Sequence, residues 1–421
     1  MRLAIGLVSG AAIAYQLLLM RLFSIVQWHH LAYMVISLAL LGYGASGALL
    51  TLLRRPLIER FETALVGLMA LFGVLAPVCF AAAQRLRLNP LEVMWDPRQF
   101  AALAAVYLLL ALPFVCVGGA VGLALIRFED SLHRIYRADL IGAAAGAATA
   151  LAALYVFQPG TCLRLVGSAG GLAAAAALAA GRRPRRPGVH PTREPRQRSR
   201  RAAWILCAVA VGSSFAWPSA WLEPRLSEYK PQSKALVVPG AEVVAERSSP
   251  LGALAAVRSP RIPFRLAPGS SFAFAGEIPD QVVIFSDGEV AGVVDRSSGV
   301  GDDGAYLDYL PAALPFYLRG DRARVALLGT GPGTALALAL RRGAAEIEAV
   351  EVNPQLSALV ADELADFTGG LYDDPRIRLH ALDPRGFLSG HLGPFDLLVL
   401  PPAESGGAPG ARVLRESYVH T

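Results

Sequence analysis

The sequence predicts a multi-pass helical membrane domain followed by a water-soluble part that combines strands and helices. Of the 421 residues, 54% are hydrophobic and only 17% are charged, which is too apolar for a typical pair of soluble domains. The long apolar runs are confined to the first half of the chain. From Pro224 onward the sequence changes to short apolar stretches broken by Pro, Gly and Ser, as expected of a soluble fold.

The apolar runs define the membrane domain, which we place at residues 1–222. A helix needs about 20 apolar residues to cross a hydrocarbon core roughly 30 Å thick. Six runs meet this length, and a seventh is weaker because Ser and Pro interrupt it. The runs are Leu3 to Val26, Leu31 to Leu53, Ala64 to Ala83, Phe100 to Ile126, Leu140 to Phe157 and Leu163 to Ala180, with Ala202 to Leu222 as the seventh.

Arginine accumulates in alternate loops, after the second, fourth and sixth runs. Positive loops stay on the cytoplasmic side, so this pattern places the N-terminus inside a bacterial-type inner membrane. The Arg- and Pro-rich segment 182–201 is predicted to be a flexible linker. It either attracts anionic lipid headgroups or acts only as a topology determinant.

The seventh run leaves the side of the soluble part open. Trp204, Trp217 and Trp221 at its two ends favour a true span, which would place everything after Leu222 outside the cell. Ser and Pro within the run favour an interfacial segment instead. Because a nucleotide-like cofactor is supplied in the cytoplasm, we expect the soluble part to be cytoplasmic.

Other polar and sulfur-containing residues of this half are expected to be structural. The net charge of +6 lies in short arginine clusters, so no nucleic-acid partner is expected; the lipid bilayer is the expected partner. The cysteines lack the spacing of a disulfide framework or a metal site. Asp139 fits a first-turn helix acid as well as a functional group. The residues concerned are Cys79, Cys116, Cys162, Cys207, Gln16, Arg21, His29, His30 and Asp139.

Residues 223–318 are predicted to form a small β-rich domain with one helix. The turn sequence Ser286-Asp287-Gly288-Glu289 indicates a hairpin, and Ala305 to Leu318 has helical periodicity. The expected strands of the antiparallel sheet are Glu242 to Val244, Leu254 to Val257, Gln281 to Phe285 and Val290 to Val294.

Residues 319–421 are predicted to form a Rossmann-like domain. The buried-strand pattern ending at Leu328 runs directly into a glycine-rich loop and then into a helix that continues through Leu340. Glycines at such a turn let the backbone approach a ligand closely, and the following helix offers unpaired N–H groups. The candidate ligand-binding residues of the loop are Gly329, Thr330, Gly331 and Gly333.

Two acids follow later strands of the same pattern. Glu351 ends the second strand, roughly 20 residues after the loop, where an acid can accept hydrogen bonds from both ribose hydroxyls. Asp383 ends the third strand, Ile377 to Leu382, where it can contact an adenine amine, and a fourth strand spans Phe395 to Leu400. The third glycine of a dinucleotide-binding loop is Thr334 here, so the loop suits S-adenosylmethionine better than NAD.

These residues resemble the spermidine synthase family of aminopropyltransferases, in particular its membrane-fused bacterial members. The resemblance is carried by Tyr43 to Gly47 and Ala138 to Ala143 in the membrane half, and by Ser286 to Gly288 and Asp302 to Asp308 in the soluble half. It implies S-adenosylmethionine or its decarboxylated form as the ligand and a small amine as the substrate. By resemblance, Glu351 would hold the ribose and Asp383 the adenine. Asp303, Tyr306 and Asp308 would bind the amine.

The sequence departs from that family at its chemically important positions. Pro332 replaces the acid that would grip the amino end of the cofactor, and Pro401 replaces the general base, which leaves Glu404 as the candidate catalytic residue. Leu307 replaces the histidine of the family's YHE pattern, and Leu251-Gly252 replaces its YQ pattern. The transferase hypothesis therefore stands beside an alternative, a membrane transporter or sensor with a non-catalytic nucleotide-binding domain. Few residues follow Leu400, so the last domain is expected to be truncated after its fourth strand.

Overall fold

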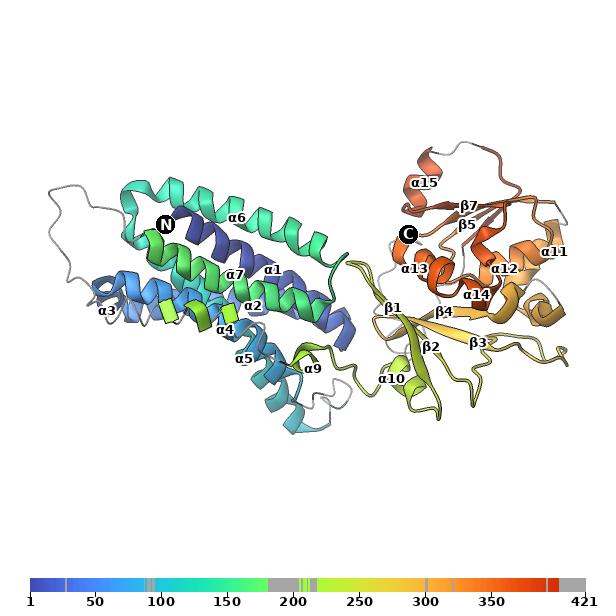
Figure 1. Ribbon diagram of the computed structural model, residues 1–421, viewed down its shortest axis with the longest axis horizontal. Helices are drawn as coiled ribbons and strands as arrows, with labels where there is room; N and C mark the ends of the chain where they lie inside the picture. Colours follow the sequence, from blue (N-terminus) through green and yellow to red (C-terminus); the bar gives the residue numbers. More distant parts are fainter. Residues whose placement is uncertain are drawn as a thin grey trace. The chain divides into compact units, whose positions relative to one another are not determined.

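The computed structural model describes residues 1–26, 29–86, 88, 92, 95–180, 204–205, 207–209, 211–212, 218–299, 302–319, 322–390 and 393–400. The chain forms two compact units, Met1–Arg225 and Leu226–Thr421 (Figure 1). The first unit corresponds to the predicted membrane domain. The second contains both predicted soluble domains, which share their packing.

The first unit is a bundle of long helices (Figure 1). Five of its helices are long and apolar enough to cross a membrane, namely α1, the Met34–Leu52 part of α2, α4, α5 and α7. The prediction of a multi-pass membrane protein is confirmed at this level. The helices are α1 (Arg2–Val26), α2 (His29–Leu52), α3 (Arg54–Glu59), α4 (Phe61–Ala83), α5 (Pro97–Arg127), α6 (Leu132–Ala153), α7 (Pro159–Ala180) and α9 (Ser219–Leu222), with a 3-10 turn η1 (Glu129–Ser131) before α6.

Helix α6 differs from the fifth predicted run, Leu140 to Phe157. It begins at Leu132, so Asp139 lies two turns inside the helix rather than in its first turn. Its carboxylate accepts a hydrogen bond from the hydroxyl of Ser9, a buried residue of α1. This inter-helix partner explains how an acid is tolerated among apolar helices, because the carboxylate is not left unsatisfied.

Glycines allow α1 and α6 to touch along their backbones. A Cβ atom added to Gly142 would collide with the carbonyl oxygen of Gly6, and one added to Gly146 would collide with that of Gly10. Both helices therefore carry glycines four residues apart at their contact. Helix packing inside a bilayer depends on such close approach, since lipid tails offer no hydrophobic penalty for separation. Helices α4 and α7 use the same device, because a Cβ on Gly73 would lie 2.6 Å from the oxygen of Gly167.

The bundle has one arginine-rich end and one end from which the chain leaves the unit. Arg2 and the start of α6 share an end, because Gly6 and Gly10 of α1 pair in parallel with Gly142 and Gly146 of α6. Leu222 lies at the other end, beside Gly160 at the start of α7, and the main-chain oxygen of Trp221 accepts a 2.8 Å hydrogen bond from Gln84 Nε2. Ala180 ends α7 about 30 Å from Gly160 along the helix axis.

The second unit begins with a short helix, α10 (Pro231–Leu236), and a four-stranded antiparallel sheet. Its strands pair in the order β1-β2-β3-β4, as predicted. The hairpin between the last two turns at Asp287 and Gly288, which have φ values of 53° and 76°, as the Asp-Gly sequence indicates. The strands are β1 (Glu242–Ser248), β2 (Ala253–Arg258), β3 (Gln281–Ser286) and β4 (Glu289–Asp295), followed by the 3-10 turn η2 (Arg296–Gly299).

The segment Ala305 to Leu318 is helical, as predicted, but it is not one continuous helix. The segment forms two 3-10 helices, η3 (Asp302–Tyr309) and η4 (Pro311–Ala313), and then a short α-helix, α11 (Leu314–Arg319). Pro311 has no N–H to donate and is the first residue of η4, so it marks the point where η3 has ended and a new turn begins.

A second, parallel sheet follows, as predicted. Its strand order is β7-β6-β5-β8, so the first strand along the chain, β5, lies between the second and the fourth. The strands are β5 (Arg324–Leu328), β6 (Glu346–Val350), β7 (Ile377–His380) and β8 (Leu397–Val399). The connecting helical segments are α12 (Thr334–Arg341), α13 (Pro354–Ala358), the π-helix η5 (Leu359–Glu363), α14 (Ala365–Thr368), the 3-10 turn η6 (Leu371–Asp373) and α15 (Pro384–Gly390).

Residues of the two predicted soluble domains share hydrophobic clusters, in keeping with the single compact unit that they form. Tyr306 and Phe316 pack in one cluster with Val325 of β5 and residues of α12. Ile284 of the antiparallel sheet packs in another cluster with Leu359 of η5. Burying these side chains jointly stabilises both parts, at roughly 25 cal/mol for each Å² of apolar surface.

Candidate functional site

The glycine loop joins β5 to α12 at the carboxyl edge of the parallel sheet. Gly329, Gly331 and Gly333 have φ values of 98°, 57° and 143°, conformations that residues with a Cβ rarely adopt. The amides of Gly329 and Thr330 donate to the carbonyl of Val350, at 2.9 and 3.1 Å. The loop is thereby fixed to the end of β6. A Cβ added at Gly329 would meet no atom within 4 Å, so this part of the loop faces open space.

Glu351 follows β6 directly and lies against the glycine loop, as the sequence predicted. Its carboxylate accepts hydrogen bonds from the backbone N–H groups of Asn353, at 2.9 Å, and Gly331, at 3.2 Å. Burial raises the pKa of Glu351 above its ordinary value of 4.5, while these two hydrogen bonds act to lower it. Two backbone N–H groups therefore already occupy part of the carboxylate's capacity to accept hydrogen bonds.

Residues that sequence analysis did not select complete the surroundings of Glu351. Tyr372 donates a 3.4 Å hydrogen bond to the carbonyl of Gly331, and burial together with the charge of Glu351 raises its pKa. Asn353 caps α13 and accepts from the hydroxyl of Ser249, 3.2 Å away in the turn between β1 and β2. The Asn-Pro sequence after Glu351 marks this helix start, but no local pattern indicates that the distant turn reaches it.

Asp383 lies near the same edge but is used as a helix cap. It follows β7, and its carboxylate accepts from the amides of Arg385, at 2.9 Å, and Gly386, at 3.4 Å, in the first turn of α15. The residue is exposed, so lone pairs remain available to a ligand. Its predicted contact with adenine stays a prediction.

Tyr306 is fully buried and belongs to an internal polar network. Its hydroxyl donates to Asp295 at 2.8 Å, and Gln281 Nε2 donates to the same carboxylate at 2.9 Å. Burial raises the pKa of Asp295, and the hydrogen bonds from Gln281 and Tyr306 oppose that rise. The network joins β3, β4 and η3, so in this conformation Tyr306 stabilises the unit and has no exposed surface for an amine.

The other predicted substrate and catalytic residues are dispersed. Asp308 forms ion pairs with Arg341, at 2.9 Å, and Arg342, at 3.4 Å, which tie η3 to the end of α12. Asp303 is exposed at the start of η3. Glu404 lies outside the described residues, as do Pro401 and the rest of the loop after β8.

Glu348, a carboxylate within β6 that sequence analysis did not select, faces the side of the sheet opposite to the site residues. Glu348 is buried and contacts His380 Nε2 at 2.5 Å, with Arg378 at 3.4 Å. Burial acts to raise the pKa of Glu348, but the hydrogen bond from His380 and the charges of His380, Arg378 and Arg324 outweigh it, so the pKa is lowered. Successive side chains of a strand point to opposite faces of the sheet, and for this reason Glu348 is not part of the site.

The adenosyl half of the implied ligand fits these residues better than its amino acid half. Glu351 lies beside the glycine loop, where Gly329 and Gly331 carry no side chains, and its carboxylate can accept hydrogen bonds, which suits a ribose. At the position of the acid that would bind an ammonium group, Pro332 offers neither a charge nor an N–H. Among the described residues, no group of three or more His, Cys, Asp or Glu side chains is arranged to hold a metal ion.

Comparison with models of known protein families finds no match to this chain. Comparison with curated proteins finds none either.

Proposed function

We propose that the C-terminal unit is a Rossmann-like domain that binds the adenosyl group of S-adenosylmethionine or decarboxylated S-adenosylmethionine at the carboxyl edge of its parallel sheet. The observation that carries the proposal is the position of Glu351, a buried carboxylate held by the glycine loop that it faces. The strand order β7-β6-β5-β8 supports it, because ligands of open α/β sheets bind where the strand order reverses, here beside β5.

Within this proposal the chain is a membrane-bound transferase that resembles spermidine synthases and moves an aminopropyl or another alkyl group to an amine. In such a transfer the amine nitrogen displaces the sulfur of the ligand and then loses a proton to a base. Glu404 is the candidate base on sequence grounds. The amine-binding role of Tyr306 and Asp308 would require the network with Asp295 and the ion pairs with Arg341 and Arg342 to rearrange.

A second candidate function is binding without turnover, in a membrane transporter or sensor. The internal hydrogen bonds of Tyr306 and ion pairs of Asp308 favour it, because the two residues implied to bind the amine are already used structurally.

The arrangement of the membrane unit bears on which side of the membrane the C-terminal unit occupies. The arginine-rich end of the bundle includes Arg2 and, through the contact of Phe61 with Phe128, the loops before α4 and after α5. Leu222 lies at the opposite end, beside Gly160. With the arginine-rich end in the cytoplasm, this arrangement supports an odd number of crossings and a C-terminal unit outside. We propose this orientation as the alternative to a cytoplasmic C-terminal unit, which the cytoplasmic supply of an S-adenosyl ligand favours.

Calorimetric titration of the full-length protein in detergent tests ligand binding. We expect heat from at least one of the two S-adenosyl ligands, and at least tenfold weaker binding by Glu351→Gln, because a charged hydrogen-bond acceptor is lost. Glu346→Gln, at the other end of the same strand, is the matched control and should bind normally. Absence of binding by the folded wild-type protein would refute the proposal. Conversion of a diamine with the decarboxylated ligand, abolished by Glu404→Gln, would exclude the non-catalytic alternative.

Labelling in spheroplasts tests the orientation. The native cysteines are buried, so a cysteine introduced at exposed Ala275 of the C-terminal unit can be labelled selectively with a membrane-impermeant maleimide. We expect Ala275→Cys to react in intact spheroplasts and Glu59→Cys, at the arginine-rich end, to react only after lysis. The reverse pattern would restore the cytoplasmic assignment.

A further inference from the structure

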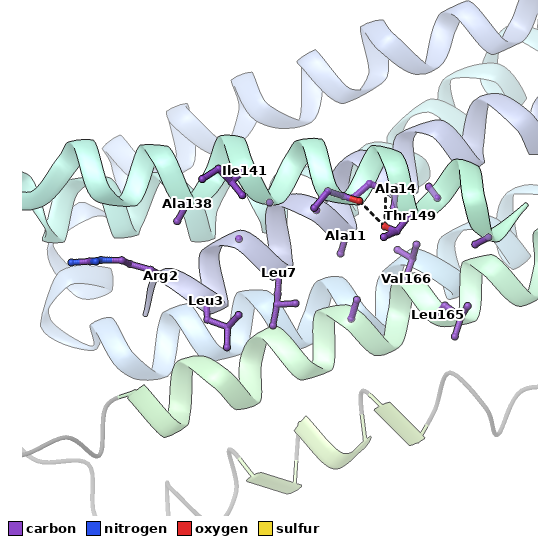
Figure 2. A pocket seen from close by; sticks show the side chains of 18 of the residues that line it. Arg2, Leu3, Leu7, Ala11, Ala14, Ala138, Ile141, Thr149, Leu165 and Val166 are labelled. Carbon is purple, nitrogen blue, oxygen red and sulfur yellow. Dashed lines mark hydrogen bonds between the residues drawn. The ribbon is translucent and has the colours of Figure 1, made fainter.

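A groove runs along the surface of the membrane unit between α6 and α7, with α1 as its floor (Figure 2). Its volume is about 630 Å³, within the range of pockets that hold small ligands. Small side chains line it, including Ala11 and Ala14 of α1 and Ala145 of α6.

The groove is long, and its two ends are lined by different residues. Along α1 its lining extends from Arg2 to Leu18, which corresponds to about 24 Å of helix. At the far end it is lined by Ala153 and Cys162, close to where α6 and α7 are connected. This shape matches an extended hydrocarbon chain that enters from the arginine-rich end.

The end of the groove at Arg2 carries a concentrated positive charge. Arg2, Arg134 and Arg137 line it, and all are exposed. Within the described parts of the chain, none of them forms an ion pair. The nearest acid along α6, Asp139, is hydrogen bonded to Ser9 at the contact between α1 and α6, while Glu129 and Asp130 lie before the helix in η1. The cationic end therefore has no matching acid in the groove.

We propose that this groove binds an anionic phospholipid, with one acyl chain along α1 and the phosphate headgroup against Arg2, Arg134 and Arg137. Arginine suits this headgroup because its planar group of N–H donors can bind two phosphate oxygens at once. The proposal does not depend on the ligand of the C-terminal unit.

Charge argues against a second copy of this chain as the occupant. Two copies in one membrane share an orientation, so a two-fold axis normal to the bilayer would bring the same surfaces together. The arginine clusters of both grooves would then face each other at the same depth. A phospholipid instead supplies the complementary negative charge at the arginine-lined end of the groove.

Native mass spectrometry of the full-length protein tests the proposal, with phosphatidylglycerol and phosphatidylcholine of identical acyl chains as the probes. We expect the wild-type protein to retain phosphatidylglycerol in preference to phosphatidylcholine. Replacing Arg2, Arg134 and Arg137 together by Gln should reduce that preference by at least tenfold, since each basic residue near an anionic headgroup contributes several-fold. Replacing Arg54, Arg55 and Arg60 by Gln at the same end of the bundle is the charge-matched control and should leave the preference unchanged.

A second variant tests the groove itself. Ala145→Phe adds a ring to an exposed residue that lines the groove, and Ala144→Phe adds the same ring to an exposed neighbour outside it. We expect only Ala145→Phe to prevent retention of the lipid, with similar thermal unfolding of both variants. Equal retention of the two lipids by the wild-type protein, or equal effects of test and control variants, would overturn the proposal. So would a wild-type dimer that Ala145→Phe dissociates, because the occupant would then be a second copy.

Discussion

Glycine serves opposite purposes in the two units of this protein. In the membrane unit, Gly6, Gly10, Gly142 and Gly146 lie inside regular helices and remove side chains where two backbones touch. In the C-terminal unit, glycines allow backbone conformations that other residues resist. Every positive-φ glycine of the described residues, from Gly240 to Gly370, lies there.

The difference follows from what stabilises each unit. Between membrane helices the bilayer supplies little hydrophobic driving force, so close van der Waals contact and paired polar groups such as Ser9 and Asp139 stabilise the bundle. In water, burial of apolar surface stabilises the fold, and glycine is then used where the chain must turn sharply at a site. A glycine replacement should therefore damage packing in one unit and ligand binding in the other.

The largest expected effect is that of Gly142→Ala. Its new methyl group would meet the backbone of Gly6, which cannot move aside as a flexible side chain could. We expect a loss of about 2–3 kcal/mol of stability, measured as a lower midpoint of thermal unfolding in detergent. Gly44→Ala is the control, since a Cβ there meets nothing within 4 Å, and it should not destabilise the protein. Equal midpoints for the two variants would contradict the role of backbone contact.

A smaller effect on stability but a large effect on binding is expected of Gly329→Ala. The new Cβ has open space around it, so the cost arises from the φ of 98° and amounts to about 1–2 kcal/mol. We expect thermal unfolding to change modestly while calorimetric binding of the S-adenosyl ligand is lost, because the methyl group projects into the space beside the loop. Unchanged affinity would show that the ligand does not lie there.

The smallest expected effect concerns two carboxylates, Glu348 of β6 and Glu351, which follows that strand. The lowered pKa of Glu348 means that its contribution to stability is present above the ordinary value of 4.5 and is lost as pH falls through the folded-state pKa. The raised pKa of Glu351 acts in the opposite direction, and stability decreases as pH rises from 4.5 through that raised pKa.

Chemical unfolding across acidic pH can separate these two contributions. We expect Glu348→Gln to reduce the loss of stability below pH 4.5, and Glu351→Gln to remove the loss above it. Variants with the same pH dependence as the wild-type protein would show that neither carboxylate is linked to folding in this way.

The sequence was sufficient for the kinds of element and for their order. Hydrophobic runs predicted the long helices, the Asp287-Gly288 turn predicted the hairpin, and the strand, loop and helix around Gly329 predicted the parallel sheet. Local patterns failed where a tertiary contact or a proline overrode them. Helix α6 extends back to Leu132 although its first turns carry Arg134 and Arg137, and Pro311 divides a segment with helical periodicity.

The candidate site was predicted in part for the same reason. Glu351 and the glycine loop are close in sequence to strand ends, so the rule that parallel strands align their carboxyl ends places them together. The actual partners of Tyr306 and Asp308 depend on residues of other elements, Asp295, Gln281, Arg341 and Arg342, and no spacing in the sequence indicates these contacts.

The sequence alone determined that the chain has a membrane half and a soluble half, because hydropathy and strand alternation are properties of short segments. The tertiary structure alone decided that Leu222 lies opposite the arginine-rich end and that α1 and α6 touch through glycines. It also decided that a groove with arginines at one end lies along α1, α6 and α7. Such features depend on which distant segments meet, and that is settled by the packing of whole helices rather than by any local pattern.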